Sequence, residues 1–221
     1  KNAHLPIHSF TTGGAPVYQL RPGTVDTGGR RAIISVTYNG TVQCHRPDGK
    51  LLWKTPTGGF FPNDLDVSDL DNDGLDESLI ASADGTLYVL DHNGRLRWKF
   101  SANAPLLTAC VVQSGTSKVI LTGGVERKIY ALTVEGKVAN TYIAEHLVRF
   151  IRKGNILGTG KEYAAVVFAR TVRGRDSYFL QVFDPANFTP IWKKNVNIAR
   201  DNLRACYFDL LTADINKDGA D

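Results

Sequence analysis

A sixteen-residue segment occurs twice in this chain, and it limits the possible folds more than any other feature. Residues 39–54 (NGTVQCHRPDGKLLWK) and 84–99 (DGTLYVLDHNGRLRWK) align without a gap, so that Trp53 and Trp98 lie 45 residues apart. Each copy has short apolar or alternating runs separated by Asp-Gly or Asn-Gly, the strongest local signal for a β-hairpin. The chain therefore repeats a unit of antiparallel strands.

Two weaker copies follow in the second half of the chain. Residues 128–138 repeat the pattern without the tryptophan, and residues 178–184 repeat it before Trp192, after an insertion around residues 173–176. An apolar run precedes each copy and begins at a small or proline-containing turn. Four strands in about 42–50 residues are typical of one propeller blade. We predict an all-β fold, a β-propeller of four-stranded blades.

The repeats also set the expected boundaries. An open propeller exposes strand edges that invite aggregation, so four blades and a stub are a poor candidate for closure. We expect a fragment of a propeller of about six to eight blades, with the remaining blades in the same polypeptide. The predicted parts are an N-terminal tail (1–15), four blades (16–56, 60–101, 105–143 and 147–197) and the start of a fifth (202–221).

One connection between predicted strands is rich in carboxylates. The segment from Asp69 to Glu77 (DLDNDGLDE) has acids at loop positions 1, 3, 5 and 9 and glycine at position 6. Such a loop turns alternate residues toward one side, where they can bind a hard cation. An EF-hand is excluded because its position 12 requires an acid and Ile80 lies there. The alternative is a turn that only caps a hairpin, but adjacent carboxylates repel one another without a cation. The predicted Ca²⁺ ligands are Asp69, Asp71, Asp73, the carbonyl of Leu75, and Glu77.

The same pattern starts again near the end of the sequence. Asp214, Asn216 and Asp218 fall at positions 1, 3 and 5, followed by Gly219. We predict that these three residues form a second calcium site. In both loops the cation would have a structural role, because it neutralises neighbouring carboxylates and stiffens the connection.

The acidic loop, the strand pair after it and the Gly-x-Leu-x-Trp ending together resemble two families of propeller blades. One is the FG-GAP (integrin α-like) repeat, and the other is the PQQ-like (quinoprotein-type) repeat. The resemblance implies calcium at the acidic loops, and it implies that the tryptophans dock one blade on the next. It also implies an exported protein, which would be secreted, periplasmic or attached to the cell surface.

Composition excludes several other classes of protein. The net charge is only +4 and the basic residues are scattered, so the basic footprint of a nucleic-acid-binding protein is missing. No apolar run reaches the length of about 18 residues that a membrane-spanning helix needs. The three cysteines lie far apart in the sequence and do not have the spacing of a zinc site.

Candidate ligand-binding residues lie where the first strand of each blade is expected to begin, because these strand ends surround the central channel. Asn63, Asp64, His146 and Arg149 are the predicted ligand-binding residues. Glu145 precedes His146, and such a neighbour can raise the pKa of a histidine and hold it as an acid or base. The alternative is an ordinary surface histidine.

Three functions are compatible with these residues. The first is a calcium-stabilised module that binds a polysaccharide or a protein at a bacterial surface. The second is part of a propeller-type polysaccharide lyase or glycoside hydrolase. The third is a periplasmic assembly scaffold of the PQQ-like kind, which needs no metal. A lyase requires a base and a cationic group that neutralises a uronic acid, and the candidates for these roles are His146, Arg149, Arg204 and Tyr207.

Overall fold

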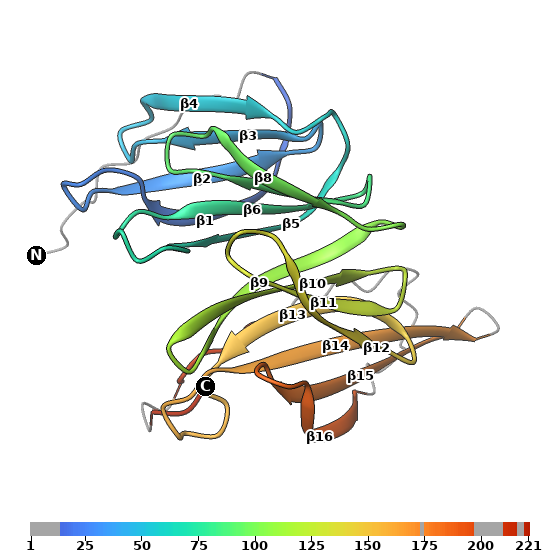
Figure 1. Cartoon of the computed structure of the whole chain (residues 1–221). Helices are drawn as coiled ribbons and strands as arrows, with labels where there is room; N and C mark the ends of the chain where they lie inside the picture. The colour runs from blue at the N-terminus through green and yellow to red at the C-terminus, as the bar shows by residue number, and fades with distance from the viewer. Residues whose placement is uncertain (1–13, 173–174, 197–209, 216–218) are drawn as a thin grey trace, which may run out of the picture.

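In the part of the chain that the structure describes, sixteen strands form four antiparallel sheets of four strands each (Figure 1). This computed structural model describes residues 14–172, 175–196, 210–215 and 219–221. The prediction of four four-stranded propeller blades is confirmed. The predicted site residues Arg204, Tyr207, Asn216 and Asp218 lie outside the described residues.

The strands of each sheet follow one another in sequence order. The first sheet contains β1 (Val17–Thr24), β2 (Arg31–Thr37), β3 (Thr41–His45) and β4 (Leu51–Pro56). The second contains β5 (Pro62–Ser68), β6 (Glu77–Ser82), β7 (Thr86–Leu90) and β8 (Leu96–Ser101). The third contains β9 (Leu106–Ser114), β10 (Ser117–Gly124), β11 (Lys128–Leu132) and β12 (Val138–Ile143). The fourth contains β13 (Leu147–Gly154), β14 (Tyr163–Val172), β15 (Arg175–Asp184) and β16 (Thr189–Val196).

The first strand of each sheet lies innermost. Strand β5 packs against β1 and β9, and β9 packs against β13. All four inner strands begin at one end of the molecule, here called the entrance face. They end at the opposite end, here called the loop face, which carries the acidic loop between β5 and β6. Ligand-binding candidates on these strands are therefore ordered around one axis.

The apolar core lies between the sheets. One buried cluster joins the first and second sheets through residues such as Ile34 and Ile80. A second cluster joins the second and third sheets around Leu79 and Val111, and a third joins the third and fourth sheets around Val112 and Phe183. Each sheet therefore needs its neighbour to cover its apolar face.

Tryptophan side chains tie consecutive sheets together at their outer edges. The indole nitrogen of Trp53 donates to the carbonyl of His92 at 2.9 Å, and that of Trp98 donates to the carbonyl of Val134 at 2.9 Å. A glycine in the turn of the next blade faces each ring: Gly94 faces Trp53 and Gly136 faces Trp98. The repeated tryptophan therefore docks one blade on the next.

The last described residues dock on the fourth sheet as the acidic loop docks on the first. Asp76 Oδ2 accepts from the backbone N–H of Thr24 at 2.6 Å, and Asp221 Oδ2 accepts from that of Asn155 at 2.6 Å. Leu210 packs against the buried cluster that contains Tyr163. The C-terminus accordingly lies near the end of β13 (Figure 1). This contact repeats at the fourth sheet the one that the acidic loop makes with the first sheet.

Gly94→Ala should destabilise the protein more than Gly59→Ala. Both glycines have positive φ, +75° and +82°, but an added Cβ at Gly94 would lie 2.5 Å from the Trp53 ring, whereas nothing lies within 4 Å at Gly59. The left-handed backbone costs both variants about 1–2 kcal/mol, and overpacking adds about 1–3 kcal/mol at Gly94 only. Urea unfolding of both variants measures the difference. Equal losses would contradict the docking role of the tryptophan.

Candidate functional site

Three carboxylates of the acidic loop converge on the loop face. Oxygen atoms of Asp69, Asp71 and Glu77 lie within 4.8 Å of one another. The Asp69 carboxylate also closes the loop, because it accepts from the backbone N–H of Asn72 at 2.6 Å and of Gly74 at 3.0 Å. Asn72 and Gly74 have positive φ, which asparagine and glycine tolerate best.

Asp73 has a different position from the one its spacing suggested. Its carboxylate accepts from the backbone N–H of Leu75 at 2.8 Å and so caps the turn. It does not belong to the group of converging carboxylates in the described residues.

Two cationic side chains reach the converging carboxylates. Nη1 of Arg97, from β8, lies 2.9 Å from Asp71 Oδ2 and 3.0 Å from Glu77 Oε1. Lys118, from β10 of the next sheet, donates to the backbone carbonyl of Asp69. Burial raises the pKa of Glu77, whereas the Leu70 N–H and the charge of Arg97 oppose this rise. Protein cations thus offset part of the negative charge of the loop.

The converging oxygens still fit a hard cation. Carboxylate oxygens are the ligands that Ca²⁺ prefers, and Asp69, Asp71 and Glu77 supply them at short mutual distances. In the second loop, Asp214 Oδ2 accepts from the N–H of Gly219 at 2.9 Å, which reproduces the bond between Asp69 and Gly74. Asn216 and Asp218 lie outside the described residues, so calcium binding in that loop stays a prediction.

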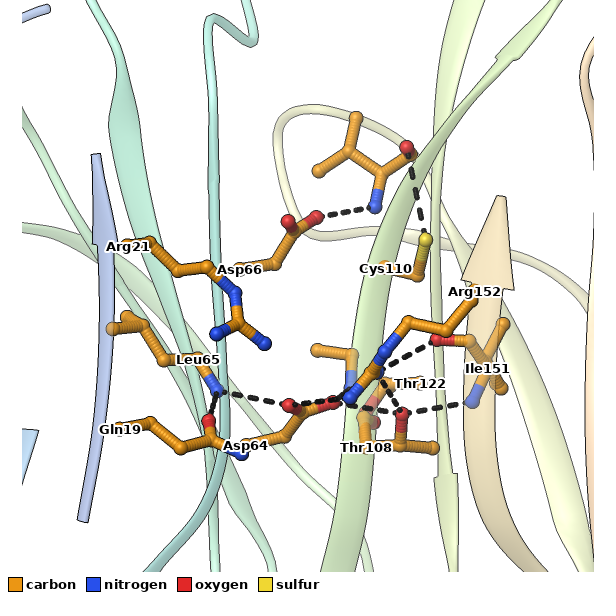
Figure 2. A network of polar contacts seen from close by, with 12 residues as sticks. Gln19, Arg21, Asp64, Leu65, Asp66, Thr108, Cys110, Thr122, Ile151 and Arg152 are labelled. Carbon is orange, nitrogen blue, oxygen red and sulfur yellow. Dashed lines mark hydrogen bonds and ion pairs between the residues drawn. The ribbon is translucent and has the colours of Figure 1, made fainter. Parts of the chain in front are cut away.

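An ion pair with several hydrogen bonds crosses the inner strands (Figure 2). Asp64, on β5, lies 2.8 Å and 3.2 Å from the two terminal nitrogens of Arg152 on β13. Between these strands, β9 contributes the Thr108 hydroxyl, which donates to Asp64 at 2.8 Å, and the Ala109 N–H, which donates at 3.1 Å. The Asp64 side chain is only 2% exposed. The pair joins three sheets at the axis.

The two candidates on β5 therefore have structural partners. The side-chain amide of Asn63 donates to the carbonyl of Leu106 at 2.7 Å, and this bond ties β5 to β9. Asp64 is enclosed by the network described above. These contacts account for both side chains, and ligand binding by either one stays a prediction.

A hollow opens on the entrance face between the third and fourth sheets. Its volume is about 570 Å³. His146 lies in its wall, and the imidazole stacks on the Phe179 ring at 5.1 Å between centroids. Glu145 is paired with Lys193, whose Nζ lies 3.3 Å from Glu145 Oε2. The lining residues are Val125, Arg127, Glu145, His146, Leu147, Ala169 and Arg170.

Arg149 is separate from this hollow. Each inner strand has one extra residue near its start, and Arg149 is that residue in β13, as Asn63 is in β5. Its guanidinium lies over the Phe150 ring at 4.8 Å, and it is absent from the described lining of the hollow. Of the two lyase candidates among the described residues, the structure brings His146 but not Arg149 into this site, whereas Arg204 and Tyr207 lie outside those residues.

Sequence reasoning missed Arg127, Arg170 and Lys193. They come from the turn after β10, from the end of β14 and from β16. No motif connects these positions. They can be found only when the positions of the strand ends around the entrance face are known.

A family model for the lambda-carrageenase beta-propeller domain matches residues 32–177, which is well over half of the chain. The chain belongs to this family. Two similar proteins are a lambda-carrageenase from Pseudoalteromonas carrageenovora and one from Pseudoalteromonas sp. Each is 27% identical over an alignment of 240 residues that includes 100% of this chain. The chain spans about a quarter of the length of these relatives, 24% in both.

Solved structures agree on the fold. Two crystal structures of BBS1N in complex with ARL6DN, one soaked with mercury and one with lead, match with TM-scores of 0.64 and 0.63. The identities are 13% and 14%, over 84% and 86% of this chain and 55% and 56% of theirs. These matches support a propeller without distinguishing FG-GAP from PQQ-like repeats. In the described part of the chain, no helix has the length and hydropathy of a membrane span.

Asp64→Ala should lower the free energy of unfolding by about 3–5 kcal/mol, because it leaves a buried charge without its partner. Arg152 is only 15% exposed and would lose both contacts. The double variant Asp64→Ala/Arg152→Met should lose less than the single variant, since no charge is then stranded. Denaturant unfolding measures both.

The exposed pair of Arg46 and Asp48 provides the control. These side chains are 44% and 47% exposed, so Asp48→Ala should cost no more than about 1 kcal/mol. A loss at Asp64 as small as the loss at Asp48 would refute the structural role of the axial pair.

Proposed function

We propose that this chain is the propeller part of an exported glycoside hydrolase that degrades a carrageenan-type polysaccharide, and that the propeller contacts this substrate through its entrance face. The similarity of the whole chain to two lambda-carrageenases carries the proposal. It favours the hydrolase, an alternative in the sequence-based reasoning, over an independent binding module or a PQQ-like scaffold.

The chemistry of the hollow supports binding rather than cleavage. Glycosidases generally use two carboxyl groups on opposite sides of the scissile bond, about 5–10 Å apart. Among the described lining residues of the hollow, Glu145 is the only carboxylate, and Lys193 already pairs with it. The reacting carboxylates would then lie in another part of the full-length enzyme.

The lyase alternative has less support. A lyase needs a base close to a cationic group that neutralises the uronic acid. The predicted base was His146, with Arg149, Arg204 or Tyr207 as its partners. In the structure His146 stacks on Phe179, and Arg149 lies over Phe150 outside the hollow. We therefore assign neither residue a catalytic role.

Calcium at the loop of Asp69, Asp71 and Glu77 is the second part of the proposal. A chelator should lower the melting temperature of the protein, because the converging carboxylates then repel one another. Asp71→Ala should lower it in calcium buffer and show little further loss with chelator. Asp48→Ala, an exposed substitution remote from the loop, is the control and should respond to chelator as the wild type does. Identical melting curves with and without chelator would rule out a stabilising calcium ion.

Glu145→Gln in the full-length hydrolase tests whether the hollow binds or cleaves. We expect kcat to stay within about threefold, because removal of a general acid or base would cost about 10²–10⁴ in rate. KM for an anionic substrate should not rise, because the change removes a negative charge from the hollow. Release of reducing sugar ends is the measurement, and Glu135→Gln, an exposed change on the loop face, is the control. A kcat reduced a hundredfold by Glu145→Gln alone would place the chemistry in the hollow and overturn the binding role.

A further inference from the structure

The hollow on the entrance face carries unneutralised positive charge. Arg127 and Arg170 both line it and both are exposed. Among the described residues, neither guanidinium is paired with a carboxylate. Arg97 and Arg152, by contrast, are held by acidic side chains. The two guanidinium groups of the hollow are therefore available to a ligand.

The acidic residue of the lining does not cancel this charge. Glu145 has Lys193 as its partner at 3.3 Å, and the Glu145 side chain is 76% exposed. Lys193 is in turn positioned over the Phe179 ring at 5.3 Å, the ring on which the His146 imidazole stacks. With Glu145 compensated, the two arginines give the hollow a net positive charge.

The rest of the lining is apolar. Val125 is 47% exposed and faces the hollow together with Leu147 and Ala169. The C–H face of a sugar ring can lie against such a wall, while a substituent of the ring reaches the arginines. The volume of about 570 Å³ leaves room for both.

We propose that this hollow binds an anionic substituent of a polysaccharide, a sulfate ester or a carboxylate, and that Arg127 and Arg170 are the residues that select it. The inference rests on the proposed function, and it adds the place where the charged substituent binds and the residues that select it. Guanidinium groups suit this task because their planar fork of donors matches an oxyanion in a bidentate way. A neutral polysaccharide would gain only the apolar contacts.

The position of Arg127 favours a fixed geometry. It lies in the turn between β10 and β11 with φ of +59°, and the backbone N–H donates to the carbonyl of Gly124 at 3.4 Å. Arg170 belongs to β14, where it pairs with Ser177 in the ladder. Both side chains thus start from ordered backbone, and a bound oxyanion costs less ordering of the protein.

Binding of three polysaccharides to the whole chain tests the inference. The probes are carrageenan as the sulfated chain, polygalacturonate as the carboxylated chain and unsubstituted agarose oligosaccharides as the neutral chain, measured by calorimetry in low and high salt. Arg127→Gln and Arg170→Gln should each weaken binding of the anionic chains about tenfold, since each removes a charge-assisted hydrogen bond. Binding of the neutral chain should change less than twofold. High salt should weaken anionic binding by the wild type.

The control is Arg95→Gln, which removes an exposed arginine from the turn between β7 and β8, away from the hollow. It should bind all three probes as the wild type does, and melting curves should confirm that every variant is folded. Tighter binding of carrageenan than of polygalacturonate would assign the substituent as sulfate, and the reverse would assign it as carboxylate.

Two results would overturn the inference while leaving the proposed function intact. One is equal affinity for neutral and anionic chains. The other is unchanged carrageenan binding by the double variant Arg127→Gln/Arg170→Gln. Absence of binding to every polysaccharide by the folded wild-type chain would instead reject the proposed substrate contact itself.

Discussion

Each sheet of this propeller depends on the next one to cover its apolar face. The buried clusters are shared between consecutive sheets, so Ile34 of the first sheet and Ile80 of the second belong to the same core. A sheet of four strands on its own would leave these residues in water. The tryptophan contacts add direction to this packing, because Trp53 and Trp98 each reach forward to a glycine of the following blade. Contacts of the outer strands thus help to fix which blade packs on which. This packing in turn positions the inner strands.

The inner strands then bring distant residues together. Asp64 and Arg152 are 88 residues apart in sequence and form a buried ion pair across three sheets. A pair of this kind is weak evidence for net stability, since desolvation opposes the attraction. Its geometry, with Thr108 between the two charges, fixes how the second, third and fourth blades meet at the axis. The same arrangement removes Asp64 from contact with solvent.

Features that depend on residues close together in the sequence could be predicted, whereas contacts between residues far apart in the sequence could not. Repeats and hairpin turns depend on neighbours within one period, so the blades were readable from spacing. The docking of Trp53 on the next blade was implied by the resemblance to known repeats, and its contact with Gly94 came from the structure. The place of Asn63 and Arg149 near the start of inner strands was also correct, because strand order fixes it. The partners of Asp64, and the approach of Arg97 and Lys118 to the acidic loop, come from other strands or other sheets. Alternation in a loop also cannot distinguish a converging carboxylate from one that caps its own turn, as Asp73 does by accepting from the Leu75 N–H, so its role as a calcium ligand stays a prediction.

The two faces of the propeller differ in how their charges are balanced, and this difference limits where a polyanion can bind. On the loop face Asp69, Asp71 and Glu77 exceed the cations Arg97 and Lys118 that reach them, so an anionic chain would meet repulsion there. A calcium ion bound there would add two positive charges and so remove this repulsion. On the entrance face Lys193 compensates Glu145, and the guanidinium groups of Arg127 and Arg170 stay uncompensated within the described residues. In the absence of calcium, electrostatic attraction would therefore direct the proposed anionic substrate to the entrance face, where the ends of strands from two sheets meet.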